Sequence, residues 1–497
     1  MAMNNTVKKT LRIAGLLLPV IFIAIFLLFP VFSVLIDGIY SDGKFTFEFL
    51  KEVFSNGFYY KLFAFTLSQA LLSTVVTLIL GIPIGYIFGR YDFPGRNIFR
   101  IFFTVPFVLP SVLVGMGFLN LFTEEGLFGS PLLSIVLAHA FYNIPLVVLY
   151  FSSYYENFDR DLISAAKTLQ SKPIHTFFRV YLPIFLQPII TAAMLTFNFS
   201  FLSFGLILFL GAPALFRTVE VQIYSEYLPG ETGIASALAI MQLLVTIAYV
   251  IIFLVIIRRN NNSEKSITTS AFPREKLIFK KIFRKFNGWI LLFFFVLGFL
   301  LEIVPMISIL IFSFISKETS SLTLENYTNL FNSAFLNIPF PFTVLNTFLF
   351  ALGGALFASL LAILTVIVLG RQQKEKRILA YETITYLPLA ISSITLSLGI
   401  LYTFENVPFF VNHPWFFIII SHGLLGYPFV TRALLNGLNT IDPEMEDAAS
   451  VLGAKFGYKL KKIYLPLLLP SLIAGFIFAF GLSIGEFTIT NIFFSSP

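Results

Sequence analysis

The sequence predicts an all-α, polytopic membrane protein built from two tandem copies of one helical unit. Three observations carry this prediction: the chain is very apolar, its basic residues gather in every second loop, and its two halves match each other. Of the 497 residues, 57% are hydrophobic and 12% are charged, whereas a soluble domain carries about 25% charged residues. The 63 phenylalanines suit surfaces that face lipid.

The apolar segments predict eleven membrane spans, because a helix needs about 20 apolar residues to cross a bilayer. We expect these spans at 11–36, 63–89, 98–121, 131–151, 184–211, 233–257, 289–315, 345–370, 380–402, 414–431 and 467–492. Lys8, Lys9 and Arg12 stand before the first apolar run. That run is longer than the apolar core of a cleavable signal, so we interpret it as an uncleaved first span.

Lysine and arginine set the orientation, because they favour the cytoplasmic loops of membrane proteins. If the N-terminus is cytoplasmic and the spans alternate, most of the 33 basic residues lie inside. Those that lie outside are Lys44, Lys51, Lys61, Arg217 and Lys317. The net charge of +7 therefore reflects topology, and it does not indicate nucleic-acid binding.

An internal repeat relates the two halves. The segment His139–Pro145 matches His422–Pro428 at an offset of 283 residues. The same offset maps Ala165-Ala166 onto Ala448-Ala449 and Leu182-Pro183 onto Leu465-Pro466. Both halves begin on the same side of the membrane, so we expect parallel repeats.

The repeat predicts the domain organisation. We expect a first repeat of six spans at residues 1–257, a basic cytoplasmic linker at 258–287 and a second repeat of five spans at 288–497. The offset places the partner of the sixth span beyond Pro497, so the last helix is expected to be missing. Truncation, a frameshift or an incomplete gene is the favoured interpretation, and a functional protein of eleven spans is the alternative.

The loop between the fourth and fifth spans of each half carries the functional argument. In the second half, Pro443 and the acidic residues after it favour a helix start, and Gly453 favours its end. A second short helix follows, with apolar residues on one side and lysines on the other. We expect two short helices outside the membrane, joined by a tight turn. The small Ala448 and Ala449 let another surface approach closely.

This loop resembles the "EAA" loop of binding-protein-dependent ABC importer permeases of type I. The matching pattern is an acidic residue, two alanines, three residues, a glycine, and then an Ile-x-Leu-Pro ending about nine residues on. The matching residues of the second half are Asp447, Ala448, Ala449, Leu452, Gly453 and Pro466. The first half has Ser164, Ala165, Ala166, Leu169, Gln170 and Pro183, with serine at the acidic position and glutamine at the glycine position. The resemblance implies that these loops dock on the ATPase subunits and couple them to the spans. Whether the degenerate first copy docks stays open, and an amphipathic loop on the membrane surface is the alternative.

The resemblance implies a permease in the plasma (inner) membrane of a bacterium or archaeon. Its expected partners are two ABC ATPase subunits on the cytoplasmic face, an extracytoplasmic solute-binding protein, membrane lipid and a small-molecule or metal-ion substrate. The chain has no Gly-x-x-x-x-Gly-Lys-Ser/Thr phosphate loop, so we expect ATP hydrolysis on a separate subunit, with no enzyme activity and no cofactor here.

Two fused halves resemble the thiamine and iron(III) permease families, and the stretches 210–224 and 482–486 favour thiamine. Iron(III) is the alternative substrate. A secondary transporter driven by an ion gradient is a more distant alternative, which leaves the two matched loops unexplained.

Polar residues inside the spans are candidates for the translocation path. Glu486 occupies the position that Ser203 has in the first half. The candidate pore-lining residues are Asn198, Ser200, Ser203, Ser483 and Glu486. Hydrogen bonding between helices is the alternative for each of them. Glu302 is expected to serve packing or an interface. His139 and His422 are expected to be structural, because no metal site surrounds them.

Overall fold

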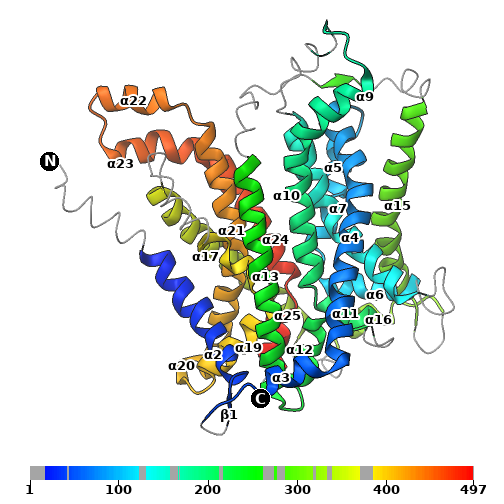
Figure 1. Ribbon diagram of the computed structural model, residues 1–497, viewed down its shortest axis with the longest axis vertical. Coiled ribbons are helices and arrows are strands. Elements are labelled where there is room, and N and C mark those ends of the chain that lie inside the picture. The colour runs from blue at the N-terminus through cyan, green and yellow to red at the C-terminus, as the bar shows by residue number, and fades with distance from the viewer. Residues whose placement is uncertain are drawn as a thin grey trace. The chain divides into compact units, whose positions relative to one another are not determined.

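The computed structural model describes residues 17–41, 44–121, 130–156, 166, 168–211, 216–260, 274–276, 286–316, 321–332, 339–369 and 384–495. Almost all the regular structure in these residues is helical (Figure 1). Two short ladders accompany the helices: β1 (Tyr40–Ser41) pairs antiparallel with β2 (Lys44–Phe45), and β3 (Tyr91–Asp92) pairs parallel with β4 (Glu275–Lys276).

The expected multi-pass helical architecture is confirmed. Among the described residues, nine helices are long and apolar enough to cross a membrane, or eleven if each of two bent pairs counts as one span. The nine are Leu17–Asp37 (with the π-turn η1, Ala24–Leu28, and α2, Phe29–Asp37), α4 (Gly57–Arg90), α7 (Pro131–Glu156), Ile174–Phe201, α13 (Thr232–Asn260), α15 (Phe286–Ser313), α17 (Phe340–Leu369), α21 (Pro414–Thr440) and Gly457–Gly485.

Short helices connect these spans. They include α3 (Glu48–Ser55), α12 (Val219–Tyr227), α16 (Glu325–Asn329), α20 (Pro408–Asn412) and α22 (Pro443–Val451). The predicted spans are interrupted at four places, and these places are equivalent in the two repeats.

The expected spans 98–121 and 380–402 are each broken. Helix α5 (Arg96–Phe102) and the 3-10 turn η2 (Val105–Val108) are followed by α6 (Ser111–Leu121) after a bend of 101°. The segment 384–390, with the 3-10 turn η6 (Leu387–Ala390), is followed by α19 (Ser393–Phe404) after a bend of 99°.

Polar groups released at these bends find partners, as a membrane environment demands. Pro110 lacks an N–H and disfavours helical backbone before it. The Leu109 carbonyl accepts a hydrogen bond from the Tyr142 hydroxyl at 2.8 Å. At the second bend, the Ser392 hydroxyl caps α19 by accepting from the Thr395 N–H at 3.1 Å.

The expected spans 184–211 and 467–492 are also interrupted. Helix α10 (Leu182–Phe201) ends before α11 (Gly205–Leu210), and α24 (Leu465–Gly485) ends before α25 (Thr488–Ser495). Ser203 lies at the first break and Glu486 at the second, 283 residues apart. The repeat offset is therefore preserved in the irregular backbone as well as in the helices.

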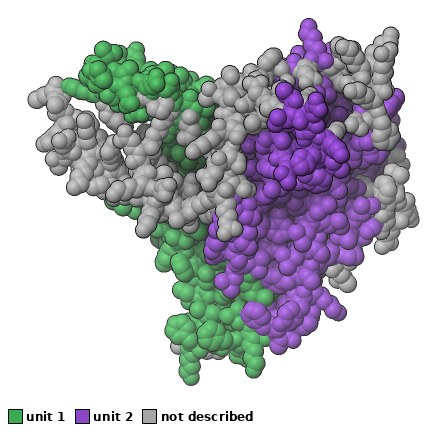
Figure 2. Space-filling view, turned by 45° about the horizontal axis from the view of Figure 1, so that its top comes forward, with its two compact units in different colours: residues 1–51, 226–243, 330–497 green, residues 52–225, 244–329 purple. Residues whose placement is uncertain are grey.

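The chain folds as two compact units, drawn in different colours in Figure 2. Unit 1 comprises residues 1–51, 226–243 and 330–497, and unit 2 comprises residues 52–225 and 244–329. These units are a different division of the chain from the two sequence repeats, so the repeat boundaries stay a prediction. The difference arises because each repeat contributes its first helix to the unit formed mainly by the other.

In unit 1, α2 of the first repeat packs on α19 of the second. A Cβ atom at Gly399 of α19 would lie 2.4 Å from the Pro30 carbonyl oxygen, so only glycine allows this approach. The Thr403 hydroxyl also donates to the Ser33 hydroxyl at 2.9 Å. This helix pair is therefore tightly fitted.

In unit 2, α15 of the second repeat packs on α4 and α6 of the first. The Ser308 hydroxyl of α15 donates to the Gly117 carbonyl of α6 at 3.4 Å. The buried side chains of Phe88 and Phe103 form ring contacts with Phe295 of α15. Aromatic packing therefore joins the two repeats inside this unit.

Candidate functional site

The candidate site consists of two equivalent loops. We call residues 442–464 the second loop and residues 159–181 the first loop, because an offset of 283 relates them. The second loop belongs to unit 1 and the first to unit 2. Figure 1 shows α22 and α23 (Phe456–Lys459) of the second loop projecting past the ends of α21 and α24.

Helix α22 begins and ends as the sequence predicts. The Asp442 side chain accepts a hydrogen bond from the Glu444 N–H at 2.9 Å, and Pro443 occupies the first turn. Gly453 ends the helix in the left-handed conformation, with φ +77°. The Ala454 N–H then donates to the Ala449 carbonyl at 2.9 Å, which is the bond of a Schellman motif.

A polar contact joins the two helices of the second loop. Lys459 Nζ donates to Ser450 Oγ at 2.8 Å and lies 3.7 Å from Glu446 Oε1. The turn beside this contact presents apolar side chains to the outside, with Val451 88% and Leu452 87% exposed. The contact holds α22 against α23 and leaves the turn accessible.

The second helix of this loop is not the separate short helix that we expected. Helix α23 continues through the π-turn η7 (Leu460–Tyr464) into α24, and Gly457–Gly485 is one helix long enough to span a membrane. Apolar residues at 456, 460 and 463 continue the apolar pattern of the span. The lysines that alternate with them therefore lie at the polar end of one long helix. A displacement of this loop would move the whole helix.

In its described residues, 166 and 168–181, the first loop has the same turn as the second despite its degenerate sequence. Gln170 adopts φ +51°, the left-handed conformation that Gly453 has in the second loop. The Ser171 N–H donates to the Ala166 carbonyl at 3.1 Å, in the same relation as Ala454 and Ala449. Leu169 beside the turn is 81% exposed. Ser164 and Ala165 lie outside the described residues.

The helices after both turns also correspond residue by residue. Helix α9 (Pro173–Thr176), the π-turn η3 (Phe177–Tyr181) and α10 begin 283 residues before α23, η7 and α24. Pro183 and Pro466 therefore both stand at the second residue of α10 and α24, directly after the π-turns. Sequence reasoning did not foresee the paired π-turns, which often mark functional sites.

The two loops differ in how they are held. The positions that match Glu446 and Lys459 carry Ile163 and Thr176. In the first loop, the Thr176 hydroxyl donates to Ser171 Oγ at 3.0 Å instead. This loop therefore lacks the charged pair that joins the two helices of the second.

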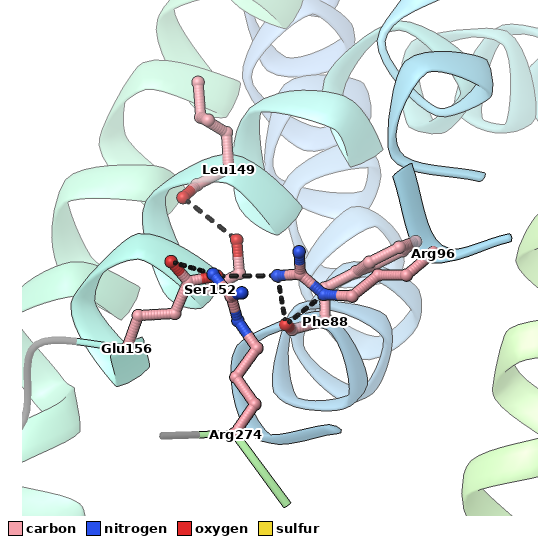
Figure 3. A network of polar contacts seen from close by, with 6 residues as sticks. All are labelled: Phe88, Arg96, Leu149, Ser152, Glu156 and Arg274. Carbon is pink, nitrogen blue, oxygen red and sulfur yellow. Dashed lines mark hydrogen bonds and ion pairs between the residues drawn. The ribbon is translucent and has the colours of Figure 1, made fainter. Parts of the chain in front are cut away.

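A charged network lies at the base of the first loop (Figure 3). Arg96 donates from Nη2 to Glu156 Oε1 at 2.7 Å, and Arg274 Nη2 lies 3.0 Å from Glu156 Oε2. Arg96 also donates to the Phe88 carbonyl through Nε and Nη2, at 3.2 and 2.7 Å. Sequence reasoning missed this network, because Arg274 lies 118 positions from Glu156 and the basic linker was expected to lie in solvent.

Glu486 lies at the break between α24 and α25. Its Oε1 accepts from the Ile489 N–H at 3.1 Å, and its Oε2 accepts from the Ser393 hydroxyl at 3.3 Å. The carboxylate thus caps the N-terminus of α25 and links this helix to α19. These bonds fix the position of Glu486, and its role in a path stays a prediction.

The paired histidines each bond a serine through Nδ1. His422 and Ser483 are 2.7 Å apart, and His139 and Ser73 are 3.2 Å apart. Ser73 comes from α4, whereas Ser483 comes from α24. Equivalent histidines thus take their serine from different helices. Among the described residues, no group of three or more His, Asp or Glu is placed to hold a metal ion.

The other candidate path residues lie near the end of α10. Asn198 and Ser200 are buried, and Ser203 is partly buried at the break. The Ser200 carbonyl accepts from Gln69 Nε2 at 2.9 Å, which joins α10 to α4. The structure brings these polar residues together within unit 2, and their contact with solute stays a prediction.

Comparison with known proteins agrees with the two-repeat organisation. The family model for "binding-protein-dependent transport system inner membrane component" matches residues 81–262 and 278–497. The thiamine transport system permease protein ThiP of Brucella abortus is 25% identical over 442 residues, covering 85% of this chain and 77% of that protein.

Two shorter relatives match about one repeat. A probable molybdenum ABC transporter permease of Haloferax volcanii is 33% identical over 186 residues, covering 36% of this chain and 68% of that protein. The sulfate permease CysT of Escherichia coli is 26% identical over 211 residues, covering 39% of this chain and 76% of its own length. With two family matches and multiple membrane-spanning helices, this chain belongs to the binding-protein-dependent transport system inner membrane components, the permeases of ABC importers.

Proposed function

We propose that this chain forms the translocation path of an importer and that both loops receive ATPase subunits on the cytoplasmic face. The observation that carries this proposal is the shared turn. Gln170 and Gly453 adopt the same left-handed backbone at equivalent positions. A loop that merely lies on lipid needs an apolar face, and it has no need for a matched turn in both repeats.

The exposed side chains at the turns support docking. Leu169, Val451 and Leu452 are each more than four-fifths exposed. Large apolar side chains that project beside charged residues are typical of protein-binding sites. The basic residues around these loops favour the cytoplasmic side, where an ATPase would be found.

A continuous helix would pass movement from the ATPase to the translocation path. Because α23, η7 and α24 form one helix, movement of the second loop would reach the break at Glu486. ATP binding would draw the two ATPase subunits together and favour one of two arrangements of the helices, and hydrolysis would favour the other. An extracytoplasmic binding protein would deliver the solute.

We propose thiamine as the solute. The thiamine permease aligns over 85% of this chain, across both fused repeats, whereas the sulfate and molybdenum permeases align over 39% and 36%. Uptake assays with the cognate binding protein, comparing thiamine, ferric iron, sulfate and molybdate, would test this choice. Uptake of an oxyanion or of iron in preference to thiamine would contradict it.

Gly453→Glu tests the docking role. A Cβ atom at Gly453 meets nothing within 4 Å, so the change acts through its positive φ and its new charge. We expect loss of ATPase co-purification and of uptake. Gly457→Glu is the matched control, because Gly457 also has open space around it but no positive φ. Normal ATPase binding and uptake by Gly453→Glu would contradict the proposal.

A further inference from the structure

The linker between the two repeats is attached to unit 2 at a specific place. Its residues 275–276 form β4, which pairs in parallel with β3, so that Tyr91 faces Glu275 and Asp92 faces Lys276. The side chain of Arg274, directly before this strand, contacts Glu156. Backbone pairing and a charged contact thus fix the same short piece of linker.

Glu156 is the residue through which this attachment reaches the first loop. It is the last residue of α7, and the chain leads from it into the first loop. Its carboxylate binds one arginine with each oxygen, and its side chain is 16% exposed (Figure 3). The Arg96 side chain is 6% exposed, and its hydrogen bond to the Phe88 carbonyl links Glu156 to the last turns of α4. The end of α7 is thereby joined to α4 and to the linker.

The second repeat has a different arrangement. The position that matches Glu156 is Asn439, which has no charge to hold an arginine. That repeat instead carries the Lys459–Glu446 pair within its loop, which the first loop lacks. The charged pair described for the second loop thus lies within that loop, whereas the charged contacts described for the first loop lie at its base.

We propose that Arg274 of the linker is a positioning residue for the first loop: through Glu156 and Arg96 it holds the end of α7 against α4, so that ATPase movement at this loop is passed to both helices. This inference rests on the proposed function, because it assigns a part of the coupling between ATPase and path. The attachment stays intact throughout the transport cycle and keeps the end of α7 against α4.

The test compares Arg274→Gln with the native chain in a complex with its ATPase, reconstituted in proteoliposomes. The readout is solute transported per ATP hydrolysed. We expect Arg274→Gln to bind the ATPase and hydrolyse ATP normally while this ratio falls roughly fivefold, within the range for changes in coupling networks. Arg274→Lys should keep most of the ratio. Lys276→Gln, which removes an exposed positive charge two residues away, is the matched control and should keep all of it.

A disulfide provides the second measurement, because the native chain has no cysteine. Asp92→Cys with Lys276→Cys joins two residues that face each other in the β3–β4 ladder, and neighbouring strands lie within disulfide reach. In the Arg274→Gln background, the oxidised pair should restore the ratio and the reduced pair should not.

Four results would overturn the inference. An unchanged ratio in Arg274→Gln, or no rescue by the oxidised pair, shows that the attachment does not position the loop, and the proposed function still stands. Loss of transport on oxidation of the Asp92→Cys, Lys276→Cys chain that keeps Arg274 shows that the linker must detach. Failure of the native chain to bind any ATPase removes the proposed function itself, and this inference with it.

Discussion

At the scale of single residues, Gln170 is the most informative position. A left-handed backbone costs a residue with a Cβ atom about 1 kcal/mol or more relative to glycine. The first loop nevertheless keeps φ +51° there, and Gly453 shows φ +77° at the equivalent position. From a turn that is kept at this cost, we infer a function that requires its shape.

Gln170→Gly should strengthen the first loop. Glycine adopts the left-handed conformation freely, so we expect ATPase affinity for this chain to rise about fivefold, which corresponds to roughly 1 kcal/mol. Titration of the purified ATPase against the chain in nanodiscs measures it. The reverse change, Gly453→Gln, should weaken binding by a similar factor. Equal affinity in both variants and the native chain would show that turn strain has no part in docking.

Lys459→Ala tests the contact between the helices of the second loop. The pair with Glu446 is partly exposed, with side chains 15% and 27% accessible, so we expect at most about 1 kcal/mol from it. The midpoint of thermal unfolding should stay unchanged while ATPase affinity falls a few fold. Lys462→Ala, which removes an exposed charge from the same loop, is the control. A similar loss in both variants would show that net charge, and not the contact, governs docking.

At the scale of elements, broken spans recur at equivalent places in both repeats. The sequence showed prolines 106, 110 and 388, but a proline is also tolerated inside a membrane helix, as Pro145 in α7 and Pro428 in α21 demonstrate. At the first bend, the Leu109 carbonyl finds its partner in Tyr142, 33 positions away. Such partners are not visible in local sequence.

Contacts between distant segments also limit what the sequence can predict of the candidate site. The helix at 443–451 and its glycine end follow from local rules of capping, so the sequence predicts them well. The fusion of α23 with α24 and the Arg96–Glu156–Arg274 network depend on tertiary packing. Those features become visible only when distant segments are brought together.

Ser392→Ala tests the cap at the second bend. Its hydroxyl accepts from the Thr395 N–H at the start of α19, and loss of such a cap costs about 1 kcal/mol. We expect a lower midpoint of thermal unfolding in detergent. Ser397→Ala is the control, because its hydroxyl donates to the Ser393 carbonyl in the same helix, and alanine favours helix there. An unchanged midpoint for Ser392→Ala would show that the bend does not depend on this cap.

At the scale of the whole molecule, each repeat supplies a helix to the unit formed mainly by the other. Helix α2 completes unit 1, and α15 completes unit 2. Phe88 and Phe103 of the first repeat would lose their ring contacts with Phe295 if α15 were removed. The two repeats are therefore expected to depend on each other for stability.

Fragments 1–260 and 261–497 test this dependence. Expressed together, they should co-purify, because α2 and α15 each supply packing to the other fragment's helices. Expressed alone, fragment 1–260 should have a lower unfolding midpoint, since the apolar faces of α4 and α6 lose α15. Full stability of each fragment by itself, without association, would contradict the exchange of helices.

The most direct test of the central claim is transport by purified components in proteoliposomes. The chain, its ATPase and its binding protein are reconstituted together, and labelled thiamine uptake is followed with ATP, with a non-hydrolysable ATP analogue, and with a proton or sodium gradient alone. The account predicts uptake with ATP and the binding protein only. Uptake driven by an ion gradient in vesicles that contain this chain and no ATPase would contradict it.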